Sequence, residues 1–253
     1  MNCSKKSVSR AALLWLIILS PFIAWGQTSR PLLHSRQEVE NVSRHFNGHS
    51  FFGDEATESQ FKKSLGSHRI LHLATHSEID DENPLNSRLL LSKQSDSDED
   101  GILFTHEIHN LPLQARLAVL SSCNTGVGKQ VNGEGVMSLA HAFAMAGCPS
   151  VVMTLWQVDD RATSKLISHF YEHLQHHTSI DVALQKAKLD YIENHDKQLA
   201  APFYWASFNA WGTVAPLQPE NVSSPSQVRW LLWGAMGLSL LLAGFVWRKV
   251  VRK

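Results

Sequence analysis

The chain has 253 residues, and its 23 Lys and Arg are balanced by 23 Asp and Glu, so its formal net charge is zero. This balance, with no basic face along the sequence, argues against nucleic acid as a partner. Its three cysteines are too few for a disulfide framework, even in an oxidising compartment.

The N-terminal 26 residues have the layout of a secretory signal peptide. A polar, basic stretch at residues 1–10 precedes the apolar run at residues 11–25, and small residues stand at Ala24 and Gly26, where a signal peptidase reads. The pattern predicts cleavage after Gly26. The apolar run is short for a membrane-spanning helix, and an uncleaved N-terminal anchor is the alternative.

The C-terminal end predicts a membrane anchor. Residues 228–247 are apolar all round and long enough to cross a bilayer, and the basic tail at residues 248–253 indicates that this end is cytoplasmic. Residues 215–227, rich in Pro and Ser, are expected to be a linker. The domain at residues 27–214 is then expected on the extracytoplasmic (periplasmic) side.

Between these ends, apolar spacing predicts helices alternating with strands. Helix-like spacing is found at residues 37–47, from about residue 57, and at residues 105–111, 133–147, 159–177 and 179–195. Strands are expected at residues 69–76, 87–92, 115–123, 149–156 and 203–212. This order is typical of an α/β fold with a mostly parallel sheet covered on both faces.

A histidine and a cysteine each end a predicted strand. His76 closes the strand at residues 69–76, and Cys123 closes the strand at residues 115–123, just before small, turn-forming residues. If these strands are parallel neighbours, both side chains emerge at the same edge of the sheet. A nearby imidazole generates or stabilises a thiolate, the reactive form of a nucleophilic cysteine. Spacing alone leaves a chance arrangement open.

Several blocks occur in the order found in a known family. They are FFGDEATESQF, RILHLATHSEIDDENPLNSRLLLS, DGILFTHEI, LAVLSSCNTGVGKQVNGEGVMSLAHAFAMAGCPSVVMTLWQVDD and PFYWASFNAWG, between about Glu38 and Gly212. On these blocks the sequence resembles the CHAT domain, a caspase-like cysteine peptidase family related to separases. The resemblance implies a caspase-like α/β sandwich with the catalytic histidine at His76 and the nucleophile at Cys123.

Two positions beside the implied dyad depart from the family pattern. Ser77 replaces the glycine that usually follows the histidine, and Asn124 stands where a glutamate often follows the cysteine. In related enzymes the N–H at the position of Ser77 forms an oxyanion hole with the N–H of the cysteine, and serine keeps this donor. The tetratricopeptide repeats that commonly precede the domain are not seen in this sequence, which leaves open a repeat-containing partner that acts in trans.

The block LWQVDD resembles the separase block in which an aspartate receives a basic residue of the substrate. The matching position is Asp160, with Asp159 beside it. Two acids past a strand end favour a Lys or Arg side chain by charge and hydrogen bonding. Alternatively, they only begin the following helix as its N-cap and first-turn acid. The two roles are compatible.

Two patterns resemble metal sites. Residues 96–107 match a calcium-binding EF-hand loop, but a strand is predicted before them where that motif needs a helix. His169, His173, His176 and His177 share one face of the helix predicted at residues 159–177 and could bind zinc, but no metalloprotease glutamate accompanies them, and a polar helix face is the better explanation. We therefore expect no metal and no cofactor.

The sequence thus predicts a membrane-anchored cysteine endopeptidase that acts on a protein or peptide substrate and cleaves after a basic residue. The alternative is a catalytically latent caspase-like scaffold or sensor that acts through protein partners.

Overall fold

The computed structural model describes residues 14–18, 32–46, 48–66, 68–93, 98–121, 128–131 and 135–217. All of them belong to the first of two compact units, residues 1–217 and 218–253. No helix in these ranges is long and apolar enough to cross a bilayer. The predicted membrane helix at residues 228–247 lies outside the described residues.

A six-stranded sheet forms the centre of the fold. Its order is β11-β10-β7-β3-β1-β2, and every neighbouring pair is parallel except β10 with β11. The strands are β1 (Leu14–Ile18), β2 (Gly48–Phe52), β3 (Ile70–Ala74), β7 (Leu117–Leu120), β10 (Ser150–Thr154) and β11 (Phe208–Gly212). The mostly parallel sheet agrees with the sequence analysis.

Two small antiparallel sheets extend from the main one. The first pairs β4 (His76–Glu78), β5 (Arg88–Leu90) and β6 (Ile102–Phe104), and the second is a hairpin of β8 (Gly128–Val131) and β9 (Gly135–Ser138). Short 3-10 turns follow β2 at Gly53–Glu55 and lie between β4 and β5 at Pro84–Asn86. Both small sheets follow strands of the main sheet directly in the chain.

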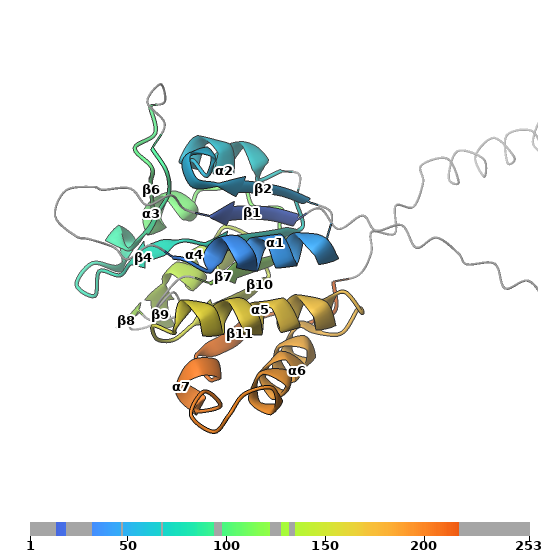
Figure 1. Cartoon of the computed structure of the whole chain (residues 1–253). Coiled ribbons are helices and arrows are strands. Elements are labelled where there is room, and N and C mark those ends of the chain that lie inside the picture. Colours follow the sequence, from blue (N-terminus) through green and yellow to red (C-terminus); the bar gives the residue numbers. More distant parts are fainter. Residues whose placement is uncertain are drawn as a thin grey trace, which may run out of the picture. The chain divides into compact units, whose positions relative to one another are not determined.

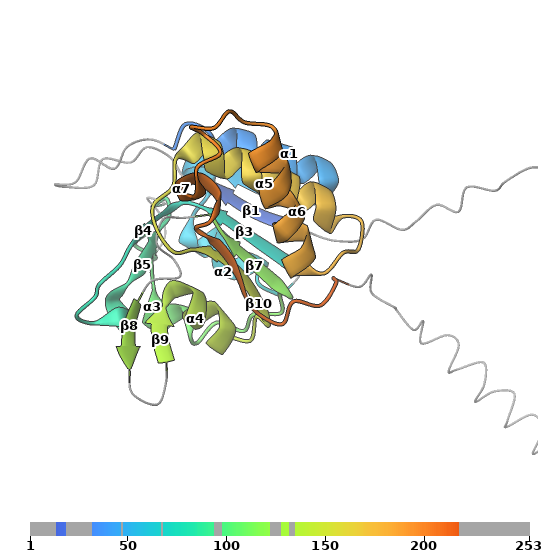
Figure 2. The same cartoon turned by 90° about the horizontal axis from the view of Figure 1, so that it is seen from below.

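Helices cover both faces of the main sheet. On one face lie α1 (Ser35–His45), α5 (Asp160–Leu174) and α6 (Ile180–Glu193), and on the other α2 (Glu58–Ser64), α3 (Thr105–Ile108) and α4 (Leu139–Met145). Figure 1 shows α1 and α5 side by side, and Figure 2 shows α4 on the opposite side of the strands from α5 and α6. A one-turn helix, α7 (Pro202–Trp205), precedes β11.

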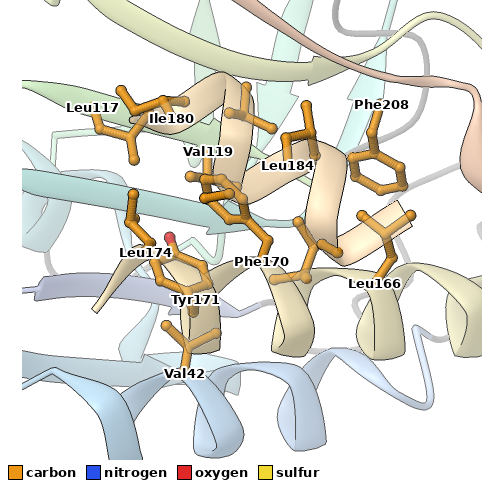
Figure 3. Close-up of a cluster of buried hydrophobic side chains, with 14 of the residues drawn as sticks. Val42, Leu117, Val119, Leu166, Phe170, Tyr171, Leu174, Ile180, Leu184 and Phe208 are labelled. Carbon is orange, nitrogen blue, oxygen red and sulfur yellow. The ribbon is translucent and has the colours of Figure 1, made fainter. Parts of the chain in front are cut away.

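Alternating side chains of the central strands build the two cores. In β7, Leu117 and Val119 face α5, whereas Ala118 and Leu120 face the other layer, and all four are fully buried. Figure 3 shows the apolar side of α5 packed against Leu117 and Val119 of β7 and against side chains of α6. A strand buried on both faces needs apolar residues throughout, which is why its sequence shows no polar alternation.

The N-terminal segment contributes a strand that the sequence analysis did not expect. β1 lies between β2 and β3, with Leu16 opposite Ser50 and His72. These residues were expected within a leader at residues 1–26, ahead of a domain beginning at residue 27. An apolar leader and an interior strand of a parallel sheet read alike in sequence, because both are short, unbroken apolar runs.

Two further boundaries differ. The helix expected at residues 133–147 begins only at Leu139, because residues 135–138 pair with β8 in a hairpin. The strand expected at residues 203–212 is divided, since Pro202 opens α7 and only residues 208–212 join the sheet.

Candidate functional site

The carboxyl ends of β3 and β7 lie side by side. Leu73 is opposite Leu120 in parallel register, and the Ser121 N–H donates to the Leu73 carbonyl at 3.0 Å, one residue past the end of β7. Along the sequence, His76 and Cys123 each follow the Leu73–Leu120 pair by three residues. Cys123 itself lies outside the described residues.

His76 and Ser77 stand where the chain passes from the main sheet to the small one. Both are half-buried, and β4 pairs them with Leu90 and Leu89 of β5. The Thr75 hydroxyl, between β3 and β4, donates to the Leu90 carbonyl. His76 is therefore held at the edge of the main sheet by a strand that pairs in a second sheet.

A buried polar chain runs beneath this edge. His72 of β3 is fully buried, and its Nε2 lies 2.8 Å from Oε1 of Glu38, which is 1% exposed, without the alignment of a hydrogen bond. Its Nδ1 is 3.2 Å from the Tyr171 hydroxyl, and the Ser121 hydroxyl donates to the same Glu38 oxygen at 2.5 Å. This row of polar side chains thereby joins α1, β3, α5 and the residue that follows β7.

Burial has the largest effect on the pKa of Tyr171, one of these buried polar side chains. It raises the pKa of Tyr171 well above its ordinary value, and the neighbouring charge of Glu38 adds to the rise. The tyrosine hydroxyl is therefore a neutral partner of His72. The sequence analysis missed these residues, although a histidine inside the apolar strand at residues 69–76 was the available signal.

Asp159 and Asp160 both begin α5. Exposed Asp159 is the N-cap, and its Oδ1 accepts the Ala162 N–H at 3.0 Å. Half-buried Asp160 accepts the His34 N–H at 2.6 Å through Oδ2. His34 is the N-cap of α1, so this bond gives its backbone N–H a partner. Burial raises the pKa of Asp160, and the hydrogen bond from His34 opposes the rise. The helix-starting role is thus observed, and substrate binding by these acids stays a prediction.

The sequence profile of the CHAT domain matches residues 4–213. The chain belongs to the CHAT domain family. The match covers the main sheet and every helix described above. It begins ahead of residue 27, where the sequence analysis expected the CHAT domain to start.

The relatives of this CHAT domain are much longer proteins. Tetratricopeptide repeat protein 28 of Homo sapiens is 25% identical over 78% of this chain and 9% of its own length. The Mus musculus protein of the same name is 28% identical over 47% of this chain and 5% of its length. The chain therefore spans less than a tenth of these relatives, which are repeat proteins by name.

Solved structures share the fold of this CHAT domain. The Saccharomyces cerevisiae separase–securin complex matches with a TM-score of 0.52 and 14% identity, covering 80% of this chain and 12% of that chain. The complex of Porphyromonas gingivalis RgpB pro- and mature domains matches with a TM-score of 0.51 and 11% identity, covering 81% and 48%. The predicted caspase-like α/β fold is confirmed.

Cys148 of the CHAT domain is a buried structural thiol. Its side chain is fully buried between α4 and β10, and its Sγ donates to the Ser150 carbonyl at 3.3 Å. Burial raises the pKa of this thiol to about 11, so almost none of it is thiolate at neutral pH. Cys148 is therefore unsuited to nucleophilic chemistry.

Three glutamates of the CHAT domain, one of them in the acidic loop, surround a lysine. Lys62 Nζ lies 2.6 Å from Glu58, 2.9 Å from Glu99 and 3.5 Å from Glu107. These carboxylates are close enough together to hold a metal ion, but the ammonium group already lies among them. Glu107, the last residue of the calcium-loop pattern, also accepts the Phe104 N–H at 2.9 Å and so caps the start of α3.

The histidines near the end of α5 are divided between helix and turn. His173 lies 2.5 Å from Asp190 of α6, and His169 lies 3.6 Å from Glu172. The helix ends at Leu174, and His177 adopts a positive φ of 59° in the following turn. Of the four histidines expected on one helical face, only His169 and His173 therefore lie on α5, and both lie close to acids.

Proposed function

We propose that this CHAT domain is a cysteine endopeptidase with Cys123 as nucleophile and His76 as acid–base partner. The proposal rests on the parallel register of Leu73 with Leu120. His76 follows Leu73, and Cys123 follows Leu120, by the same number of residues. The carboxyl ends of parallel strands meet at one edge of a sheet. Membership of the CHAT family and the caspase-like fold support it.

In this mechanism the Cys123 thiolate attacks the scissile carbonyl carbon, and the carbonyl π electrons move to oxygen. The N–H groups of Ser77 and Cys123 are the proposed donors to that oxyanion. As the tetrahedral intermediate collapses, the C–N bond breaks and His76 gives its proton to the leaving amine. Water, deprotonated by His76, then attacks the thioester and releases the acid and the thiol.

A covalent probe tests the dyad. We expect an acyloxymethyl ketone with an arginine next to its warhead to label the full-length protein, and labelling to disappear in Cys123→Ala and in His76→Ala. Cys148→Ala is the matched control, because it removes a thiol that is buried and weakly acidic. Labelling that survives in Cys123→Ala would overturn the proposal.

We further propose that Asp159 and Asp160 select a basic residue before the cut. A carboxylate pairs with a guanidinium through two charge-assisted hydrogen bonds. Asp160→Asn should lower turnover of an arginine substrate at least about tenfold, or about 1.4 kcal/mol. Folding should change little, because the asparagine amide oxygen still accepts the His34 N–H. If Asp159→Asn and Asp160→Asn both keep the preference for arginine, the acids only begin helices.

A latent scaffold is the second candidate function. It is favoured by the relatives, in which the matched segment is a small part of a tetratricopeptide repeat protein. On this proposal a repeat-containing partner binds in trans and either activates the dyad or uses the domain for docking. The separase neighbour was itself solved with a protein partner, securin. Probe labelling that appears only after such a partner is added would favour this candidate.

We also propose that residues 228–247 anchor the protein in a membrane with the CHAT domain outside the cytoplasm. The support is the length and apolar character of this segment, with the basic residues that follow it.

A further inference from the structure

A cavity of about 470 Å³ lies among α1, α5 and the end of α6. Figure 2 shows these three helices next to one another on the same face of the sheet. The described residues that line the cavity include none with a carboxylate, in a chain whose acids and bases balance. They are His34, Gln37, Asn41, Arg161, Ser164, Lys165, Ser168, His169, Asn194 and His195.

The lining follows helical spacing. Gln37 and Asn41 are four residues apart on α1, and the α5 residues recur at three and four residues from Arg161 to Ser168, so each helix turns one polar face to the cavity. The opposite side of α5 is buried against the sheet, as Leu166 and Phe170 show. Polar side chains from α1, from α5 and from the residues that follow α6 therefore converge on one space.

Two of the lining side chains are permanent cations without a carboxylate partner among the described residues. Arg161 is exposed and makes no ion pair there. Lys165 donates to Nε2 of His195 at 2.9 Å, and Nδ1 of this imidazole donates to the Tyr191 carbonyl at 2.7 Å. The arrangement requires a neutral imidazole, which orients the ammonium group but leaves its charge uncompensated.

Three acids lie beside the cavity without lining it. Asp160 accepts the N–H of His34, a lining residue, and Asp190 lies 2.5 Å from His173 and 4.0 Å from His169. His169 also lies 3.6 Å from Glu172, so its imidazole is not one of the two cations that lack a carboxylate partner. The N-terminus of α5 adds a positive partial charge near Arg161, the second residue of that helix.

From this cavity we infer a binding site for a small phosphorylated anion, a function beyond the proposed peptidase activity. A guanidinium fork matches phosphate oxygens in pairs, and an ammonium group binds them as a point charge. The amides of Gln37, Asn41 and Asn194 add neutral donors, which suits a ligand with many acceptor oxygens. The volume exceeds what one phosphate group fills and lies within the usual range for small-molecule sites.

Titration calorimetry with pyrophosphate tests the inference on the full-length protein in a non-ionic detergent, at constant ionic strength. We expect saturable binding to the wild type and at least tenfold weaker binding to the double variant Arg161→Gln, Lys165→Gln. The matched control is Lys186→Gln, which removes one charge from the exposed side of α6, outside the cavity. Its affinity should stay within twofold of the wild type.

Competing anions identify the chemistry that is recognised. Pyrophosphate should bind at least tenfold more tightly than citrate, a polyanion of carboxylates, and than inorganic phosphate. Equal affinity for citrate would overturn the assignment to phosphate. If pyrophosphate binding does not saturate, or if the double variant binds pyrophosphate as tightly as the wild type, the proposed site is wrong. These outcomes do not depend on peptidase activity, since a Cys123→Ala background should give the same affinities.

Discussion

Lys62 holds together three carboxylates that would otherwise repel one another. Burial raises the pKa of Glu58 from its ordinary 4.5 to about 7, and Lys62 opposes that rise and lowers the pKa of Glu99. The folded state therefore binds the Glu58 proton more tightly than the unfolded chain does. Consequently, the contribution of Glu58 to stability is greatest at low pH and falls as the pH rises from about 4.5 to about 7.

Removing Lys62 should cost most at alkaline pH. We expect Lys62→Met to lower the free energy of unfolding by about 2–4 kcal/mol at pH 8, because a buried carboxylate loses its counter-charge. At pH 5 the loss should be smaller, since Glu58 is then protonated. Urea denaturation at both pH values measures the difference. Lys63→Met, an exposed neighbour on α2, should change stability by less than about 0.5 kcal/mol; equal losses in both variants would contradict this account.

The hydroxyl of Tyr171 is predicted to stabilise the buried chain beneath the sheet edge. Tyr171→Phe leaves Nδ1 of His72 without its partner, so the free energy of unfolding should fall by about 1–3 kcal/mol. Tyr204→Phe is the control, because no hydrogen bond to its hydroxyl is found among the described residues, and it should be nearly neutral. Guanidinium denaturation of the two variants tests this, and similar losses in both would show that the bond to His72 adds nothing.

The residues of the candidate site differ in how far the sequence alone predicts their position and role. The apolar pattern before His76 predicts a strand that ends at this residue. β3 confirms the strand but ends at Ala74, and His76 begins β4. The contact between His72 and Tyr171 joins residues 99 positions apart, and no local pattern encodes it. For Asp159 and Asp160 the sequence left two roles open, and the structure resolves the helix-starting one through hydrogen bonds to Ala162 and His34.

Among the elements, the strands with apolar side chains on both faces were predictable, whereas β1, expected within a leader, β2 and the β8–β9 hairpin were not. β3, β7 and β10 are buried on both faces, so unbroken apolar runs mark them in the sequence. β2, with the sequence GHSFF, was missed because its first residues are exposed and polar. The β8–β9 hairpin was missed because its pairing, rather than apolar spacing, decides the conformation of residues 135–138.

β1 gives a prediction at the scale of one strand. Its backbone is paired on both sides, by β2 and by β3, and a proline within a sheet removes a donor from the ladder. Leu16→Pro in the full chain should therefore lower the free energy of unfolding by about 3 kcal/mol or more, measured by urea denaturation.

Leu16→Val is the matched control for that substitution. Valine keeps the backbone N–H and suits a strand, so the loss should stay below about 1.5 kcal/mol. If the proline and valine variants are equally stable, β1 adds nothing to the sheet, and a leader that is removed after Gly26 becomes the better account of these residues.

At the scale of the whole molecule, the proposed membrane topology predicts opposite results at two fusion points. A phosphatase reporter that is active only outside the cytoplasm should be active after residue 220 and silent after Lys253. The physical reason is the basic tail, which resists transfer across the bilayer. Activity at the far C-terminus would contradict the anchor at residues 228–247.

The buried thiol of Cys148 can report on the unfolding of the domain. Because its thiol is fully buried and scarcely ionised at neutral pH, a thiol reagent can reach it only when the packing of α4 against β10 opens. In a chain with Cys3 and Cys123 replaced by alanine, the labelling rate relative to an unstructured cysteine peptide gives the equilibrium constant for that opening. Stability can thus be read in native buffer, without denaturant.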